Sequence, residues 1–339
     1  MKIAVFAYSR QGCRVARRVM EHFEKEEVRA FTMERFGEDG FEPICRPSVP
    51  FYGPIFHWAE ALVFIGSCGI AVREIAPHVR DKRTDPAVIA IDELGRFAVP
   101  LLSGHIGGAN AMALDLARLL GATPVITTAT DINNRFSVDT WAARNGYVIP
   151  NIHRAKIVSA RILEQDVPLR SDFPVLTAYP NGVVPGDSGE VGICISYKKE
   201  EPFIETLRLI PPALHLGIGC RKGATAESIR EAVEAVLARH NIDKRAIACA
   251  ASIDLKANEQ GLLDFCWENG WPISFYSAEE LSRVRGDFTP SDFVESVTGV
   301  DNVCERAALT GAKELIVKKT AIGGVTIAIA AENVEVRFG

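Results

Sequence analysis

The sequence lacks several patterns that would assign it to a familiar class of protein. It contains no uninterrupted apolar stretch of about 20 residues, the length that a membrane-spanning helix needs. Its basic residues form only short clusters, such as Arg17-Arg18 and Lys318-Lys319, and the net charge is -5. Because nucleic-acid binders usually show a basic stripe or domain, we expect neither a membrane nor a nucleic acid as a partner.

Patterns for metal binding and redox chemistry are also missing. The eight cysteines are scattered without a CxxC pair, so the sequence predicts neither a zinc ribbon nor a thioredoxin-type site. The histidines form no HExxH pattern, and no protein-bound metal is predicted. The first residues turn polar too soon for a secretory signal, so we expect a cytoplasmic protein with free thiols.

The composition is that of a folded globular protein, with 47% hydrophobic and 24% charged residues in a chain of 339. At roughly 100–200 residues per domain, this length predicts two or three domains. Apolar strands alternate with helices over residues 1–140, which predicts an N-terminal α/β domain with a largely parallel sheet between two helical layers. A small middle domain over 141–212 and a C-terminal α/β domain over 213–339 complete the expected multi-domain α/β fold.

Local patterns predict individual elements within these domains. We expect strands at 2–7, 61–65, 87–91, 97–102 and 124–128, helices at 11–23 and 109–119, and a proline-rich loop at 43–54. In the last domain, Ser277 and Glu280 form a capping-box pattern, and Gly323-Gly324 turns a hairpin over 314–330. Asp301 is an acceptable N-cap for a following helix.

The first candidate site is the turn with Gly66 and Gly69, which follows the apolar strand at 61–65. Ligands bind at the carboxyl ends of parallel strands, and backbone N–H groups at a helix start attract anions. An anion or carbonyl site and a tight structural turn explain this stretch equally well. Ile70 stands where the nucleophile elbow G-x-C-x-G needs its second glycine, so we expect Cys68 to be buried and inert.

Charged residues flank both ends of the expected strand at 87–91. The stretch D-K-R-T-D at 81–85 precedes the strand, and Asp92-Glu93 follows it. A solvated surface is the simpler interpretation of both. At the carboxyl end, however, an acid such as Glu93 would serve as a general base if burial raised its pKa toward the working pH.

The strongest candidate is the stretch L-L-S-G-H-I-G-G-A-N at 101–110, between a strand and a helix. Its glycines let the backbone approach a ligand closely. Ser103, His105 and Asn110 gather polar groups in the same turn, and histidine moves protons near neutral pH. The alternative is a glycine-rich connection with a surface histidine, and we favour a functional role.

Two further stretches lie in the last domain. The segment G-I-G-C-R-K-G at 217–223 misses the spacing of a dinucleotide fingerprint by one residue. Arg221 and Lys222 at a helix start can still hold a carboxylate or phosphate, and a structural turn is equally compatible. Around Glu305, a helix start lined with Ser, Thr and Asn suits substrate carboxylates, or is an ordinary capped helix.

Together these stretches resemble the CbiG family, the cobalt-precorrin-5A hydrolases of anaerobic cobalamin synthesis. The N-terminal resemblance rests on G-S-C-G-I-A-V-R-E-I-A-P at 66–77, D-K-R-T-D-P at 81–86, D-E-L-G-R-F at 92–97, the stretch at 101–110, and P-V-I-T-T-A-T-D at 124–131. The last domain, with 217–223 and S-V-T-G-V-D-N-V-C-E-R-A-A-L at 296–309, resembles the CbiG/CobE C-terminal domain. The resemblance covers nearly the whole chain, and the middle domain matches least.

The resemblance implies a reaction without an added cofactor, on a cobalt-containing tetrapyrrole that carries a δ-lactone. Water opens the lactone, and a two-carbon fragment leaves as acetaldehyde to give cobalt-precorrin-5B. Lactone opening needs a base for the water, donors for the oxyanion and an acid for the leaving alkoxide. The cobalt belongs to the substrate, and the sequence leaves a homodimer open.

On this sequence, the catalytic candidates are His105, Glu93 and Ser103. Glu93 or His105 would activate water, and the backbone at 66–69 and 104–108 would supply oxyanion donors. The alternative role of His105 is to approach the substrate's cobalt. The expected substrate-binding residues are Gly66, Gly69, Arg73, Asp85, Gly107, Gly108, Asn110, Arg221, Lys222 and Glu305. Among these, Arg73, Arg221 and Lys222 would pair with the substrate's peripheral carboxylates.

Two other functions stay open at this point. The chain could be a corrinoid carrier that shields an unstable intermediate without catalysis, since the last domain shows no convincing nucleophile. It could also be a nucleotide-dependent α/β enzyme, although the glycine spacing argues against this.

Overall fold

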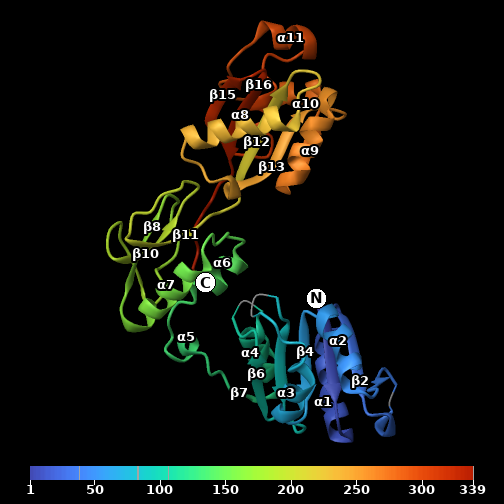
Figure 1. Cartoon of the computed structure of the whole chain (residues 1–339). Coiled ribbons are helices and arrows are strands. Elements are labelled where there is room, and N and C mark those ends of the chain that lie inside the picture. The colour runs from blue at the N-terminus through green and yellow to red at the C-terminus, as the bar shows by residue number, and fades with distance from the viewer. Residues whose placement is uncertain (38, 82–83, 106, 339) are drawn as a thin grey trace. The chain divides into compact units, whose positions relative to one another are not determined.

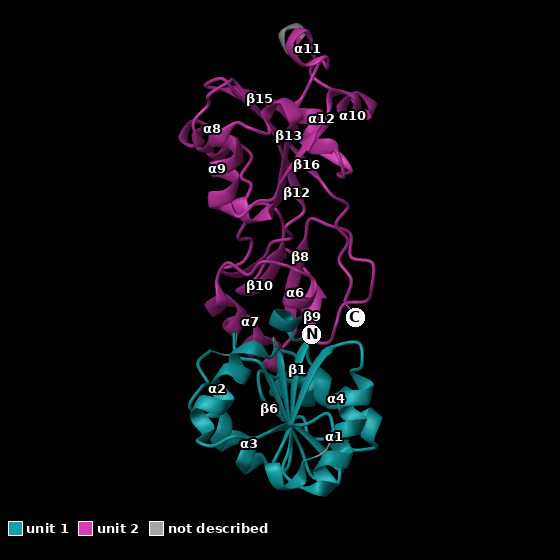
Figure 2. Cartoon of the chain, turned by 90° about the vertical axis from the view of Figure 1, so that its right-hand side faces the viewer, with its two compact units in different colours: residues 1–140 teal, residues 141–339 magenta. Residues whose placement is uncertain are grey.

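The computed structural model describes residues 1–37, 39–81, 84–105 and 107–338. The chain divides into two compact units, residues 1–140 and 141–339, coloured separately in Figure 2. Three sheets and the helices around them confirm the multi-domain α/β fold (Figure 1). Lys82, Arg83 and Ile106, which belong to two of the sequence motifs, lie outside the described residues.

The N-terminal unit is built on one twisted sheet in the order β3-β2-β1-β4-β5-β6-β7. Its strands are β1 Lys2–Ala7, β2 Glu27–Thr32, β3 Glu42–Pro43, β4 Ala61–Ile65, β5 Ala87–Ile91, β6 Phe97–Leu102 and β7 Thr123–Pro124. All paired neighbours run parallel except β5 and β6, which form an antiparallel hairpin. The strands β6 and β7 therefore run against the other five.

Helices cover both faces of this sheet, as the alternating sequence predicts. The helices α1 (Arg10–His22) and α4 (Ala109–Leu120) bury their apolar sides in one core cluster. On the other face, α2 (Ser48–Trp58) and α3 (Cys68–Ile75) pack in a second cluster. Because α1 follows β1 on one face and α3 follows β4 on the other, the chain changes sides between these neighbouring strands.

Three local predictions for this unit are wrong or incomplete. Residues 48–58 form helix α2 instead of a proline-rich loop, since Tyr52, Ile55 and Phe56 share a buried face and Pro50 lies in the first turn, where its missing N–H costs little. The strand expected at 124–128 is only the two-residue β7. The strand β2 had no counterpart among the predicted elements.

The second unit contains two sheets. The four-stranded sheet has the order β11-β10-β8-β9, with β8 Val167–Ser171, β9 Val183–Pro185, β10 Val191–Ile195 and β11 Glu205–Leu209. The five-stranded sheet has the order β14-β13-β12-β16-β15, with β12 Leu214–Cys220, β13 Ile247–Ile253, β14 Ile273–Tyr276, β15 Glu314–Ile322 and β16 Val325–Ala331. A division of this unit at residue 212 stays a prediction.

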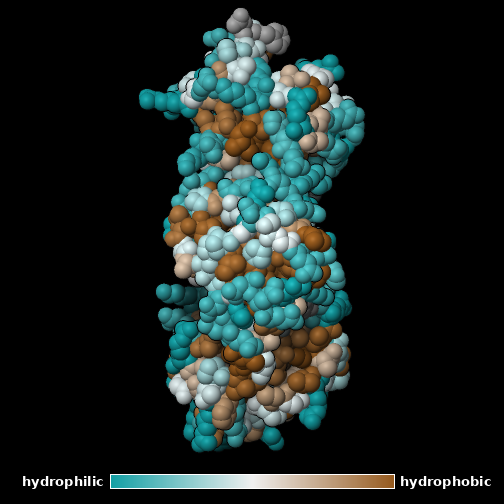
Figure 3. Space-filling view, turned by 90° about the vertical axis from the view of Figure 1, so that its left-hand side faces the viewer, coloured by the Kyte–Doolittle hydropathy of each residue, from teal (hydrophilic) through white to brown (hydrophobic). Residues whose placement is uncertain are grey.

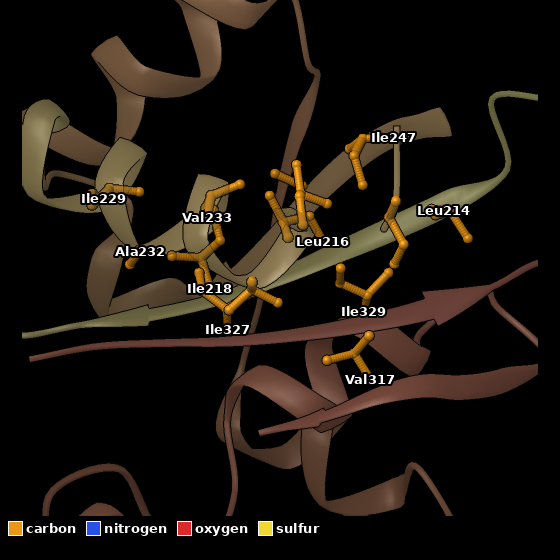
Figure 4. Packing of buried hydrophobic residues seen from close by; sticks show 14 of the residues in the cluster. Leu214, Leu216, Ile218, Ile229, Ala232, Val233, Ile247, Val317, Ile327 and Ile329 are labelled. Carbon is orange, nitrogen blue, oxygen red and sulfur yellow. The ribbon is translucent and has the colours of Figure 1, made fainter. Parts of the chain in front are cut away.

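Helices complete both parts of the second unit. They are α7 (Ile152–Glu164), α8 (Ala226–Arg239), α9 (Gln260–Asn269), α10 (Ala278–Arg283), α11 (Asp292–Thr298) and α12 (Cys304–Leu309), while the short α5 (Ala129–Ile132) and α6 (Val138–Arg144) precede them. Figure 4 shows aliphatic side chains from β12, β16 and α8, among them Leu216, Ile327 and Val233, packed together in the largest core. Strand residues that alternate between faces thus bury one row against α8.

Two predictions for the last sheet are confirmed and one is wrong. The capping box between Ser277 and Glu280 is present, and β15 and β16 form the expected hairpin around Gly323-Gly324. Asp301 does not cap α12, whose first residue is Cys304. The side chain of Asn302 accepts the hydrogen bond from the Glu305 backbone N–H instead, at 2.9 Å, and Asp301 pairs with Arg306.

No helix in the described part of the chain has the length and apolar character needed to cross a bilayer. Figure 3 shows several separate apolar patches divided by hydrophilic side chains on the face that it displays. Scattered exposed apolar side chains of this kind are normal on globular proteins and need no partner to explain them.

Candidate active site

A cleft of about 430 Å³ lies at the carboxyl ends of β1, β4 and β5. It is lined by Tyr8, Ser9, Ile65, Gly66, Ser67, Ile70, Asp92 and Glu93. This is the point where the connections after β1 and β4 leave toward opposite faces of the sheet. Open α/β sheets bind ligands in the crevice at such a point.

The first turns of two helices border this cleft. Ser9 is the N-cap of α1, where its hydroxyl accepts a hydrogen bond from the Gly12 N–H at 3.0 Å. Ser67 is the N-cap of α3. The first N–H groups of a helix have no partner within the helix and carry partial positive charge, so both starts favour a negatively charged group in the cleft.

The two acids at the end of β5 have different roles in the structure. Asp92 accepts hydrogen bonds from the backbone N–H groups of Leu94, Arg96 and Phe97 at 2.7–3.2 Å and thereby holds the hairpin turn. Glu93 is exposed and accepts a hydrogen bond from the Ser9 hydroxyl at 2.8 Å. The burial that the sequence argument required of Glu93 is therefore absent, and a bound ligand would have to supply it.

Tyr8, one of the residues that line the cleft, is paired with Tyr52 in the core. The hydroxyls of Tyr8 and Tyr52 are hydrogen-bonded at 2.8 Å, and Tyr52 is only 1% exposed. Burial and the neighbouring Tyr52 raise the pKa of Tyr8 far above its usual range, and burial raises the pKa of Tyr52 to about 12. Both phenols therefore stay protonated, and Tyr8 lines the cleft as a neutral side chain whose hydroxyl is bonded to Tyr52.

The turn at 66–69 is tied to β5 by its backbone, and the charged Arg73 reaches back toward it along α3. The Gly66 N–H donates to the Ile91 carbonyl, which ties this turn to β5. A side chain at Gly69 would meet only the guanidinium of Arg73, at 4.0 Å, so Arg73 lies back along α3 toward its first turn. Cys68 is exposed rather than buried, contrary to the expectation, because it is the first residue of α3 on its solvent side.

The glycine-rich stretch at 101–110 builds a second polar cluster. His105 Nε2 lies 3.0 Å from Asp131 Oδ2 and 3.0 Å from Thr130 Oγ1. The amide of Asn110 donates to Asp131 and to Thr128, each at 2.9 Å. An imidazole held by a carboxylate in this way is oriented for proton transfer. Asp131, the last residue of the stretch T-A-T-D at 128–131, is thus the partner of His105.

The backbone of this turn is tightly packed. Ser103 has a φ of 56°, and its hydroxyl donates to the Asp85 carbonyl at 2.9 Å. Asp85 is 7% exposed and accepts a hydrogen bond from the Arg80 N–H, so both residues hold the turn. A Cβ on Gly107 would overlap Ser103, and Gly108 starts α4 in the left-handed conformation that glycine adopts easily.

The structure separates the two candidate bases. Leu102 pairs with Val88 at the start of β5, because β6 runs antiparallel to β5. The stretch that follows β6 is therefore at the amino end of β5, while Glu93 lies beyond its carboxyl end. The five residues of β5 alone span about 16 Å at about 3.3 Å per residue, so Glu93 and His105 cannot act on one bond.

The remaining predicted site residues lie in the second unit. Arg221 and Lys222 are exposed after β12, and the Arg221 N–H bonds to the Gly324 carbonyl of the β15–β16 turn. Glu305 is completely buried. Its carboxylate accepts hydrogen bonds from the Thr289 N–H and hydroxyl, the Asn302 amide and the Lys319 N–H, at 2.6–2.9 Å. In this structure Glu305 holds neighbouring segments together.

Sequence reasoning named the turn at 66–69 but missed Tyr8 and Ser9 in the cleft, and it missed the contacts of Thr130 and Asp131 with His105. Tyr8 and Ser9 follow β1 and therefore lie at the same edge of the sheet as Glu93, but only the strand order of the fold brings them beside it. Among the described residues, no group of three or more histidine, cysteine or acidic side chains is arranged to hold a metal ion.

Comparisons with known proteins identify relatives of this chain. Residues 51–131 match the family model for the cobalamin synthesis G N-terminal region, and residues 214–330 match the model for the cobalamin synthesis G C-terminus. A crystal structure of a cobalamin biosynthesis protein G homolog from Sulfolobus solfataricus is similar, with 23% identity, coverage of 97% of both chains and a TM-score of 0.40.

Two curated relatives span nearly the entire chain. The cobalt-precorrin-5A hydrolase of Priestia megaterium is 31% identical, and the match covers 96% of this chain and 94% of the relative. The enzyme of the same name from Salmonella typhimurium is 33% identical, with 96% and 97% covered. This chain therefore belongs to the cobalt-precorrin-5A hydrolase family.

Proposed function

We propose that this chain hydrolyses cobalt-precorrin-5A, opening its δ-lactone with water and releasing acetaldehyde to give cobalt-precorrin-5B. The near full-length similarity to two hydrolases of that name is the observation that carries the reaction. The cleft at the ends of β1, β4 and β5 is the site we propose for the lactone edge of the macrocycle, because an acid and two helix starts meet in it.

Glu93 is the general base in this proposal. Its carboxylate, held by the Ser9 hydroxyl, takes a proton from water while the water oxygen attacks the lactone carbonyl carbon. The macrocycle covers Glu93 when it binds and removes the bulk water around it. The developing oxyanion faces the N–H groups at the start of α3, and the carboxylate product pairs with Arg73.

Breaking the lactone C–O bond leaves an alkoxide, which needs a proton. Tyr8 is the donor in this proposal, since it lines the same cleft and its phenol stays protonated. The Tyr8 phenolate takes this proton back as the C–C bond between the alcohol carbon and the ring breaks and acetaldehyde leaves. The electron pair of that bond passes into the conjugated macrocycle, so no added cofactor takes part in the proposed reaction.

The other predicted residues have supporting roles. Ser103, Asp85, Gly107, Gly108 and Asn110 shape the turn that carries His105, which is the alternative base at the opposite end of the sheet. Arg221 and Lys222 are proposed to pair with peripheral carboxylates of the substrate. We further propose a cytoplasmic enzyme that binds no nucleic acid, and a homodimer remains compatible with the proposal.

The test is a turnover assay with the purified chain and cobalt-precorrin-5A, without added cofactor. Acetaldehyde is measured by coupling to alcohol dehydrogenase and NADH. Repeated release of acetaldehyde supports the hydrolase. If the corrinoid binds but no acetaldehyde is released, the hydrolase is contradicted and the chain is a carrier. If the corrinoid does not bind and no acetaldehyde is released, both functions are refuted.

A further inference from the structure

A cysteine, a histidine and a glutamate lie close together on the five-stranded sheet of the second unit. Neither candidate base of the proposed reaction belongs to this unit. His215 on β12 pairs in register with Cys249 on the parallel strand β13, so both side chains leave the same face. Glu332 follows β16 directly, and its backbone N–H is bonded to the Ala213 carbonyl. Three neighbouring strands thus position these side chains.

The contacts of His215 favour its protonated form. Its Nε2 lies 2.8 Å from Glu332 Oε1, and its Nδ1 lies 3.3 Å from the Thr310 carbonyl oxygen. A neutral imidazole donates from only one nitrogen, whereas an imidazolium donates from both. The neighbouring Cys249 and the hydrogen bond to Glu332 raise the pKa of His215 to about 9, so the ring is cationic at neutral pH.

The other cysteines lie in different surroundings. Cys13, Cys194, Cys266 and Cys304 are buried, and burial raises the thiol pKa of the last three. Cys45 and Cys68 are exposed, whereas Cys220 and Cys249 are partly exposed, and burial raises the thiol pKa of Cys220. Cys249 is the register partner of His215 and still reaches solvent, and a thiol beside a cationic imidazole has the surroundings of reactive cysteines, because positive charge stabilises the attacking thiolate.

We propose that Cys249 is a thiol-modification site whose substrate is a small disulfide. The Cys249 thiol gives its proton to solvent, and the thiolate sulfur attacks one sulfur of the disulfide beside the His215 imidazolium. A new S–S bond forms to Cys249, and the other half of the disulfide leaves as a thiolate, so no further oxidant is needed. Glu332 is a positioning residue that holds the imidazole in place.

Competitive labelling of the full chain tests the proposal. The folded protein is treated briefly with iodoacetamide, or with glutathione disulfide, and the labelled fraction at each cysteine is measured by peptide mass spectrometry. We expect Cys249 to react at least tenfold faster than Cys45 and Cys68, although both are more exposed. Slower reaction of Cys249 than of these two, or alkylation without a glutathione adduct, would overturn the proposal.

Variants separate activation from exposure. His215→Gln should slow labelling of Cys249 at least tenfold and leave Cys45 unchanged, whereas an unchanged Cys249 rate would refute the role of His215. If His215→Gln does not fold, Glu332→Gln serves, because Glu332 is half exposed and its loss should slow Cys249 severalfold. Glu335→Gln is the matched control, since Glu335 pairs with Arg337 and should leave the rate unchanged. Neither outcome depends on acetaldehyde release.

Discussion

The two ends of the N-terminal sheet contain similar groups in different arrangements. Each end has a glycine-containing turn before a helix, an acid and a hydroxyl. At one end, Ser9 and Glu93 line a cleft together with the start of α3. At the other end, His105, Asn110 and Asp131 bond mainly to one another.

This difference shows that a dense motif in sequence is not the same as a ligand site. Polar groups that satisfy each other stabilise a turn, whereas polar groups around a cavity keep capacity for a ligand. The stretch at 101–110 has the stronger sequence signal. The cleft has the better geometry for holding one edge of a large substrate, and substitutions at the two ends can decide between them.

The largest expected effect on turnover comes from replacing Glu93, and the matching replacement of His105 is its control. Glu93→Gln should lower kcat for acetaldehyde release roughly 10²–10⁴-fold, because the amide cannot take a proton from water. His105→Gln, its counterpart at the other end, should change kcat less than about threefold and retain a hydrogen bond to Asp131. Steady-state kinetics of both variants check this. The reverse result would move the active site to His105.

The second effect concerns stability at the end that carries His105. In Gly107→Ala, the added Cβ would overlap Ser103 and lie 2.9 Å from the Ser103 carbonyl oxygen, so the turn must shift. We expect a loss of about 1–3 kcal/mol in the free energy of unfolding, seen as a lower thermal midpoint. Activity per folded molecule should stay near that of the unchanged chain. A normal melting temperature would mean that the turn is loosely packed.

A third change separates two roles of Ser9. Ser9→Ala removes the N-cap of α1, at a cost of about 0.5–2 kcal/mol, and the hydrogen bond to Glu93. The lost hydrogen bond should lower kcat/KM about 2–10-fold. Ser9→Asp is the control, because aspartate also caps helices but repels Glu93. It should keep the stability and lose the activity, and full activity in it would contradict the role given to Ser9.

The smallest effect is expected at Gly69. Its Cβ would meet no atom closer than 4.0 Å, and alanine favours the helix by up to about 1 kcal/mol. Gly69→Ala should therefore melt at the same or a slightly higher temperature. If the substrate approaches the start of α3, KM should rise severalfold at unchanged stability. An unchanged KM would place the substrate elsewhere in the cleft.

Much of the sheet could be predicted because its strands are short apolar runs bounded by polar residues or glycine. The strands β1, β4, β5 and β6 have the expected bounds. Helix α2 could not be found in this way, because Pro50 and Pro54 suggest a loop and only its contacts with the sheet show its buried face.

The sequence analysis predicted several residues of the candidate site but did not separate them into two places. The reversal of β6 separates Glu93 from His105, and the sequence does hold a signal for it. The connection at 92–96 is far too short for a parallel crossover, which needs a dozen or more residues, so a hairpin was the only choice. The partners Ser9 and Asp131 depend on contacts between distant segments and become visible only in the fold.

The β5–β6 hairpin also has a consequence for the order of folding. Its strands are joined by a short turn and can pair early, whereas β1 and β4 are separated by residues 8–60, and pairing over so long a stretch of chain is slower. The hydrogen bond between Ser9 and Glu93 joins residues 84 positions apart. We therefore expect the cleft to be completed late in folding, so that a newly made chain gains its hydrogen-exchange protection at β5 and β6 before it can bind substrate.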